Sequence, residues 1–394
     1  MVLQRTLFLS AWFGLLAMLG SFRAQAATYT VFSGQSIQTK INAATNGDVI
    51  VIFNGFYSEN LTVNKSIAIA NANGQRFTYA GTLTITNGVK AQFRGFNLTS
   101  GTVELRNASA DFTRSTIQGD VNATVATMAD GTTPNRLSFT RCTLSATLTS
   151  SAGETFLADN TLKWVRASGS GKMWMIGNLV DVGLVDGGEF VMAQGTSSLF
   201  AYNNVIRRTH SGFLYNDNIG IKVYSGAKLE AHNNVVYQMA NSYGSTSGNS
   251  RGIHLDGSAG SAITSNLFLS AGRWFVYGPL SMNTATFNHS SSSYGGGIVP
   301  QNTLAADPLV VDTTNFVLGA SSPARDAGNP DPRFNDIDGT RNDMGIYGGP
   351  FYDPEGRTGS KPVVLKAELD NSQFVKGELS SVKLKAAGAA TGAP

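Results

Sequence analysis

The chain has 394 residues, with 29 basic and 26 acidic side chains. Charged residues make up 14% of it, against a typical ~25%. The pI of about 8.9 depends in part on Arg5 and Arg23, which lie in an expected leader; without them 27 bases face 26 acids. No cluster of lysine and arginine is present, so we expect no nucleic-acid partner.

Residues 1–26 have the layout of a secretory signal peptide. Arg5 precedes an apolar run from Leu7 to Leu19, and Ala24-Gln25-Ala26 forms a small-x-small cleavage site. The apolar run is too short for an ordinary membrane span, although a retained anchor is the alternative. We therefore expect a secreted chain that begins at Ala27 and is extracellular, periplasmic or attached to the cell surface, with no membrane span in the mature chain.

Cys142 is the only cysteine, so no internal disulfide can form. A secreted chain of this length without disulfides needs a large core or a continuous ladder of hydrogen bonds. We interpret Cys142 as a small buried apolar residue, because no activating partner is evident near it in the sequence.

The mature N-terminus predicts a cap for a stack of strands. The stretch from Ser36 to Ala44 predicts a short helix with Ile37 and Ile41 on one face. Asn46-Gly47-Asp48 ends it, and the apolar run from Val49 to Ile52 predicts a buried strand. Such a helix would cover a strand edge that otherwise invites aggregation.

Short motifs recur along the chain at a variable period. "IGNLV", "YNNVI", "HNNVV" and "TSNLF" place Asn178, Asn204, Asn234 and Asn266 at steps of 26, 30 and 32 residues. Units of two or three short strands bury a core only when stacked. Asparagine tolerates left-handed backbone and can form side-chain ladders, so we interpret these four as structural. The pattern predicts an all-β chain: a right-handed parallel β-helix solenoid with a short N-terminal capping helix.

Two segments carry a family resemblance. "SIQTKINAATNGDVIVIFNGFYSENLTVNKSIAI" resembles the opening of pectin-lyase-like β-helix proteins. "DPLVVDTTNFVLGASSPARDAGNP" and "DIDGTRNDMGIYGGP" resemble the closing segment of secreted bacterial β-helix repeat proteins. The resemblance implies a β-helix with cap and closing segment over 27–350, followed at 351–394 by a linker and a tail or the start of a further small β domain. It implies no single reaction, because the superfamily includes lyases, polygalacturonases and adhesins.

Strand alternation predicts an outward aromatic column. Aligned on their asparagines, the repeats place Met173/Met175, Leu199/Ala201, Leu229/Ala231 and Ser261/Ile263 facing inward. The intervening side chains that face outward are Trp174, Phe200, Tyr202, Glu230 and His232. Flat aromatic faces on a solvated wall bind sugar rings, so we expect a substrate-binding surface here. The alternative is that a loop covers them and makes a satellite core.

A second outward column carries charge. "GIKVYSG" and "GIHLDGS" align at a step of 32 residues. This alignment groups Arg166, Lys222, Tyr224, His254 and Asp256 in or near one column, with Arg251 at its edge and Met192 and Gln194 one coil before Lys222 and Tyr224. The simplest interpretation is a solvated polar strand face.

The charged column also fits β-elimination of a uronic-acid polymer. Cations would neutralise the substrate carboxylate, a base would remove the neighbouring proton, and an acid would assist the leaving oxygen. Lys222 would be the base, its pKa lowered by another cation, and the catalytic set would be Lys222, Arg251, His254 and Asp256. "NIGIKVYS" resembles the lysine strand of alginate and chondroitin B lyases. The pectate-lyase motifs Arg-x-Pro-x-x-Arg and Trp-Ile-Asp-His are absent, and glycoside hydrolysis fits less well.

We favour a monomer that binds an acidic polysaccharide or cell-surface glycan over a polysaccharide lyase, and an adhesive or structural surface protein as a further alternative. No cofactor is required. "NDIDGTRND" offers Asp336, Asp338 and Asp343 around Gly339 and resembles part of a Ca2+ loop. The preferred interpretation is a cap loop held by bonds from aspartate to backbone and by an aspartate–Arg341 pair.

Overall fold

The computed structural model describes residues 26–72, 77–124, 135–151, 153–183, 187–209, 217–239, 250–279, 282–289, 294–359, 363–369 and 384–389, the last two ranges as backbone. The expected leader, apart from Ala26, lies outside these residues. No helix within these ranges is both long and apolar enough to cross a membrane.

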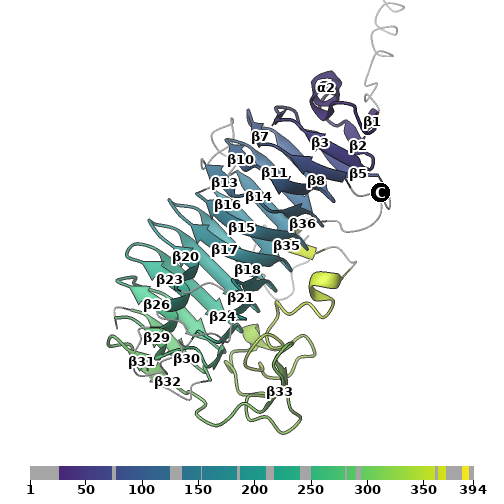
Figure 1. The fold of residues 1–394 in the computed structure, drawn as a ribbon. Helices are drawn as coiled ribbons and strands as arrows, with labels where there is room; N and C mark the ends of the chain where they lie inside the picture. Colours follow the sequence, from purple (N-terminus) through teal and green to yellow (C-terminus); the bar gives the residue numbers. More distant parts are fainter. Residues whose placement is uncertain are drawn as a thin grey trace, which may run out of the picture.

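The strands stack as a right-handed parallel β-helix with three walls, which confirms the predicted fold (Figure 1). The first wall contains β1 Thr28–Val31, β2 Val49–Ile52, β5 Ala68–Asn71, β8 Lys90–Arg94, β11 Ser109–Thr113, β14 Arg136–Thr140, β16 Glu154–Ala158, β18 Lys172–Ile176, β21 Ser198–Tyr202, β24 Lys228–His232, β27 Ala262–Thr264, β30 Thr284–Thr286 and β32 Pro300–Gln301.

Two long strands, β15 Thr143–Ser150 and β17 Thr161–Ala167, run through both of the other walls. The second wall adds β3 Gly55–Ser58, β6 Phe77–Ala80, β9 Asn97–Ser100, β12 Thr116–Ile117, β19 Leu179–Asp181, β22 Val205–Arg207, β25 Val235–Tyr237 and β28 Leu267–Leu269. The third wall adds β4 Leu61–Val63, β7 Leu83–Thr86, β10 Val103–Arg106, β13 Val121–Thr124, β20 Gly188–Ala193, β23 Asn218–Tyr224, β26 Arg251–Asp256, β29 Trp274–Tyr277 and β31 Tyr294–Gly295.

One continuous apolar core fills the helix. Successive strands pair in register, so identical positions on neighbouring coils stack on one another. Phe93, Phe112 and Phe139 stack in this way, with ring centroids 4.5 and 4.8 Å apart. The inward positions expected from the repeats are buried, as predicted.

The predicted N-terminal cap is confirmed. Helix α2 (Ile37–Ala43) is capped by Ser36, whose hydroxyl accepts a hydrogen bond from the Thr39 N–H. Ile37 and Ile41 are buried beneath it. The Glu59 carboxylate on the next coil accepts hydrogen bonds from the Ser36 hydroxyl and the Ile37 N–H, at 2.8 and 2.7 Å, and so ties the cap to the stack.

A ladder of buried asparagines follows the first wall through the molecule. Its members are Asn160, Asn178, Asn204, Asn234, Asn266 and Asn288, all fully buried. From Asn178 onward, each Oδ1 accepts hydrogen bonds from the backbone N–H and the Nδ2 of the asparagine one coil before it, as Asn234 does from Asn204 at 3.0 and 3.0 Å. The structural interpretation of these residues is confirmed.

One detail of that interpretation is wrong. The left-handed backbone belongs to the residue before each ladder position, as at Gly177, Asn203 and Asn233, where φ is 67°, 54° and 57°. At Gly177 a Cβ atom would lie 2.3 Å from Asp159 Oδ1, so a larger residue would require the Asp159 side chain to shift. The ladder asparagines therefore act through hydrogen bonds alone.

Cys142 lies one coil before Asn160 at the same corner, and its backbone N–H donates to Asn160 Oδ1. It is buried as expected, and burial raises the pKa of its thiol to about 12.

Residues 303–359, the closing segment, return along the outside of the first and second walls (Figure 1). It contains the short pair β33 (Val310–Asp312) and β34 (Val317–Leu318) and the 3-10 turns η1 (Pro332–Phe334) and η2 (Gly356–Thr358). Phe316, Leu318 and Met344 form a second apolar cluster with outward side chains of β22, β25 and β28. Beyond it, β35 (Val363–Leu369) pairs with β36 (Leu384–Ala389) and contacts β16.

The closing segment continues past residue 350, where we expected the β-helix domain to end. Arg141 Nε donates to the Gly356 carbonyl at 2.9 Å, and Arg114 Nη2 donates to the Gly359 carbonyl at 2.8 Å. These arginines are more than 200 residues earlier in the sequence, so local patterns carried no sign of the contact. Residues 351–359 therefore pack against the helix as part of the same unit.

The ladder predicts a position-specific loss of stability. Asn234→Ala leaves the Asn204 N–H and amide without their acceptor and the Ala201 carbonyl without its donor. Since each buried polar group left unsatisfied costs about 1–3 kcal/mol, we expect the free energy of unfolding in urea to fall by at least about 2 kcal/mol. The exposed Asn64→Ala is the control; equal effects at both positions would contradict the ladder's role.

Candidate functional site

The expected charged column lies on the third wall. Register pairs Arg166 with Met192, Met192 with Lys222, Lys222 with His254 and His254 with Tyr277. Tyr224 pairs with Asp256 two residues further along the same strands. The alignment of the repeats is therefore confirmed. We define the third-wall patch as Arg166, Glu189, Lys222, Tyr224, Arg251, His254, Asp256 and Tyr277.

Lys222 lies at the centre of the patch and is paired with a residue that we did not predict. Its Nζ is 2.9 Å from Glu189 Oε1 and 3.8 Å from Asp256 Oδ2. The ammonium lies 4.4 Å from the centre of the Tyr224 ring, and the Tyr224 hydroxyl donates to Glu189 at 3.0 Å. Lys222 thus has two acidic neighbours and an aromatic face.

This environment overturns the expected titration of Lys222. Burial alone would lower its pKa, but the contacts with Tyr224 and Glu189 outweigh burial and raise the pKa above the ordinary value. We expected a neighbouring cation to lower it, and that prediction is wrong because Glu189 lies closest. Lys222 is therefore a permanent cation near neutral pH and is unsuited to accept a proton.

Arg251, His254 and Tyr277 form the other half of the patch. Arg251 Nη1 lies 3.2 Å from His254 Nδ1, and its guanidinium lies 4.4 Å from the centre of the Tyr277 ring. Burial and the charge of Arg251 lower the pKa of His254 to about 4. Since the guanidinium can only donate, His254 is neutral near pH 7 with Nδ1 as the acceptor.

The expected aromatic column is only partly exposed. Trp174 stacks between Phe156 and Phe200, with centroids 4.7 and 5.0 Å apart, and Trp174 and Phe200 are half-buried. Tyr202, however, stacks on Phe351 at 4.5 Å. The predicted exposure of the column is therefore wrong at Tyr202, because the closing segment covers it. Sugar binding by Trp174 and Phe200 stays a prediction.

The remaining members of that column follow the same pattern. His232 stacks on Phe334 at 5.0 Å, and burial lowers its pKa to about 4. Glu230 is exposed and accepts a hydrogen bond from the Tyr202 hydroxyl at 3.0 Å. The alternative we considered, a satellite core, describes Tyr202 and His232.

The aspartates of the cap loop bind backbone amides. Asp336 accepts from the Gly349 N–H at 2.6 Å, Asp338 from the Thr340 N–H at 3.0 Å and Asp343 from the Asp326 N–H at 2.7 Å. Within the described ranges, no group of three His, Cys, Asp or Glu side chains could hold a metal ion. The cap-loop interpretation is confirmed for the backbone bonds, but the aspartate–Arg341 pair is wrong: Arg341 donates to the Gly328 carbonyl.

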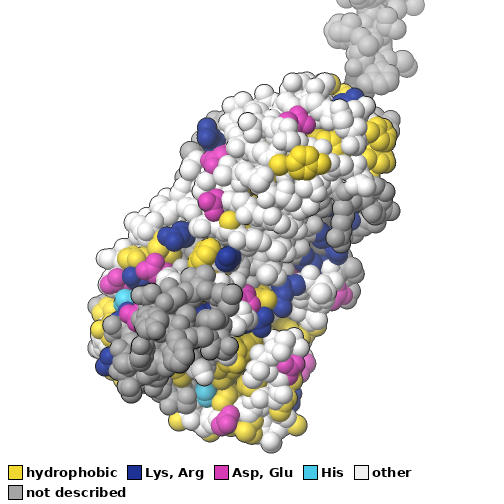
Figure 2. All heavy atoms as spheres, viewed as in Figure 1, with side chains coloured by type: hydrophobic (Ala, Val, Ile, Leu, Met, Phe, Trp, Pro, Cys, Tyr) yellow, Lys and Arg dark blue, Asp and Glu magenta, His cyan; other side chains and the backbone are white. Residues whose placement is uncertain are grey.

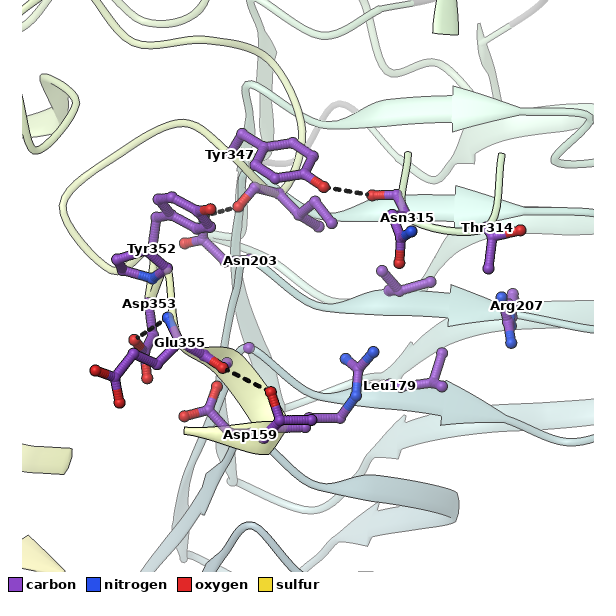
Figure 3. Close-up of a pocket in the computed structure, with 17 residues that line it drawn as sticks. Asp159, Leu179, Asn203, Arg207, Thr314, Asn315, Tyr347, Tyr352, Asp353 and Glu355 are labelled. Carbon is purple, nitrogen blue, oxygen red and sulfur yellow. Dashed lines mark hydrogen bonds between the residues drawn. The ribbon is translucent and has the colours of Figure 1, made fainter. Parts of the chain in front are cut away.

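Sequence reasoning missed a cavity of about 370 Å³ between the second wall and the closing segment (Figure 3). Its lining includes Asp159, Leu179, Arg207, Tyr347, Tyr352, Asp353 and Arg357. Asp159 and Asp353 are 194 positions apart, so no repeat pattern could have joined them. The sequence feature that could have indicated this contact is the pair of asparagines in "YNNVI". The first of them, Asn203, donates hydrogen bonds to the Ile346 and Gly348 carbonyls of the closing segment.

Charged side chains of both signs are spread over the face seen in Figure 2. This distribution agrees with the small excess of basic over acidic side chains in the sequence, 29 against 26. Comparison with known proteins gives likenesses to solved structures. No family model and no curated protein matches the sequence. The crystal structure of pectate lyase Pel9A matches 82% of this chain and 96% of that chain, with 16% sequence identity and a TM-score of 0.46.

The His254 environment predicts a specific titration. In Arg251→Met the stem is kept and the charge is lost, so the pKa of His254 should rise from about 4 toward its ordinary value. His232, whose pKa is lowered by burial alone, should not change. NMR titration of the ring protons measures both. A His254 pKa that stays in place, or a His232 pKa that moves equally, would contradict the Arg251 contact.

Proposed function

We propose that the chain is a secreted or surface β-helix protein that binds acidic polysaccharide along the third-wall patch. The observation that carries this proposal is the presence of two cations without an acidic partner. Within the described residues, Arg166 and Arg251 have no carboxylate within 4.0 Å, whereas Lys222 is paired with Glu189. The Nε of Arg251 is also buried without a hydrogen-bond acceptor.

An elongated, charged and hydroxylated ligand suits this arrangement. The strand pairing places Arg166 two coils before Lys222 and Arg251 one coil after it. Neighbouring coils are about 4.8 Å apart, so the cations are spread along the wall. Guanidinium groups recognise carboxylates in bidentate fashion. Tyr224 and Tyr277 add flat aromatic faces, and Glu189 and Asp256 add acceptors for hydroxyl groups. A single small anion would use only one of these cations, whereas a polymer chain would use both.

Binding is favoured over β-elimination because the expected base is a poor one. Lys222 has a raised pKa, and a general base works best with a pKa near the working pH. The second candidate, lyase activity, is favoured by a different residue. The neutral imidazole of His254 lies on the coil between Lys222 and Tyr277, beside the cation Arg251. In that case His254 would accept the proton and the cations would neutralise the uronate.

The proposal predicts selective loss of binding in charge variants. Arg166→Met and Arg251→Met should each weaken binding of alginate, polygalacturonate or a glycosaminoglycan by about threefold to tenfold, because each removes one charged contact. Lys228→Met, an exposed lysine on the first wall, is the matched control. Affinity electrophoresis in gels that contain each polymer measures the loss, with dextran as a neutral reference.

Two outcomes would overturn binding at this patch: retention of no acidic polymer by the wild type, or retention that both arginine variants keep. The ultraviolet absorbance of unsaturated products distinguishes the second candidate. Product formation by the wild type that is lost in His254→Gln would establish lyase activity. Loss in Lys222→Ala with retention in His254→Gln would return the base to Lys222.

A further inference from the structure

A second site lies apart from the third-wall patch, in the cavity between the second wall and the closing segment (Figure 3). Its volume of about 370 Å³ falls within the range of small-molecule pockets. Leu179 on β19 and Val205 on β22 form its apolar floor together with Ile346 of the closing segment. The cavity therefore exists only because residues 303–359 return along the helix.

Asp159 is a buried carboxyl group in this cavity, and one of its oxygens accepts no hydrogen bond. Its side chain is 3% exposed and its Oδ2 has no hydrogen-bond partner. The nearest cation, Arg141, lies 3.9 Å from Oδ2 but is bonded to Asp353 at 3.1 Å. Burial and the neighbouring Asp353 raise the pKa of Asp159 to about 7. A buried carboxyl oxygen that accepts no hydrogen bond is costly, and a ligand hydroxyl at this position would offset that cost.

The rest of the lining combines donors, acceptors and apolar surface. Arg207, held by Asp181 at 2.9 Å, and Arg357 supply donors. Tyr347 and Tyr352 meet edge to face at 5.4 Å and supply ring surface. Guanidinium donors and carboxylate acceptors therefore both lie next to an apolar floor. A site for a single ion would present groups of one charge.

The side chains that line the cavity disfavour most classes of ligand. A metal cation is disfavoured by the two arginines, and the described residues offer no three-ligand metal group. A phosphate or other compact anion is disfavoured by Asp159, Asp353 and Glu355. A purely apolar ligand would leave these charges unsolvated. A polyhydroxylated ring both donates to carboxylates and accepts from guanidinium groups, and its C–H face packs on aliphatic and aromatic side chains.

We propose that this cavity is a binding site for a neutral sugar, large enough for one or two rings, with Asp159 as the principal acceptor and Leu179 as the floor. The site is independent of the third-wall patch, because none of its lining residues belongs to the patch. A chain with both sites could hold an acidic polymer on one wall and a neutral sugar on another.

Saturation-transfer NMR tests the site with methyl glycosides of D-galactose, D-glucose and D-mannose as probes. The wild type should bind at least one of them. Asp159→Asn should weaken that binding by about tenfold, because a hydrogen bond to a charged group is lost. The variant should fold, since asparagine tolerates the φ of 56° at this position. Leu179→Trp, which fills the floor, should abolish binding, and thermal melting checks the fold of both variants.

Arg333→Ala, an exposed change elsewhere on the closing segment, and Arg251→Met on the third wall should bind the probes like the wild type. Several results would overturn the proposal. They are failure of all three glycosides to bind, equal binding by wild type and Asp159→Asn, displacement of the probes by inorganic phosphate at equal concentration, and loss of binding in Arg251→Met. The last result would move the sugar to the third-wall patch, so the two proposals fail separately.

Discussion

Every coil must repeat the register of the coil before it, although the coils differ in length. The ladder asparagines are separated by 18, 26, 30, 32 and 22 residues, yet each makes the same pair of hydrogen bonds to its neighbour. A one-residue slip would turn every side chain of a strand to the opposite face. The ladder holds one corner constant, so that insertions in the coils are confined to other turns. The columns on the walls depend on this constancy.

The paired asparagines of "YNNVI" and "HNNVV" divide two tasks between them. The second asparagine, Asn204 or Asn234, points inward and joins the ladder. The first, Asn203 or Asn233, adopts the left-handed conformation and turns its side chain outward. Asn203 Nδ2 donates to the Ile346 carbonyl at 2.9 Å, and Asn233 Nδ2 donates to the Asp343 carbonyl at 2.7 Å. The corner that fixes the register is therefore also the attachment for the closing segment.

Sequence reasoning succeeded where periodicity carries the information. The step from Lys222 to His254 followed from alignment alone, because parallel strands in register preserve alternation. It failed at Glu189, since Phe190 and Val191 are both buried in the core and strict alternation is broken there. It failed again at Tyr202 and Asp159, because their partners Phe351 and Asp353 come from a segment with no repeat. Periodicity predicts the contacts between neighbouring coils. It carries no information on the contacts that the closing segment makes with their outer surface.

The closing segment covers parts of the first and second walls and leaves the third-wall patch uncovered. Its aromatic side chains cover Tyr202 and His232 on the first wall, and its apolar side chains cover Val205 and Val235 on the second. Those contacts turn outward columns of both walls into a second core and leave a cavity at its edge. The third-wall patch takes part in neither contact. Its cations Arg166 and Arg251 remain without acidic partners within the described residues, which is the arrangement expected of a wall that meets an external polyanion.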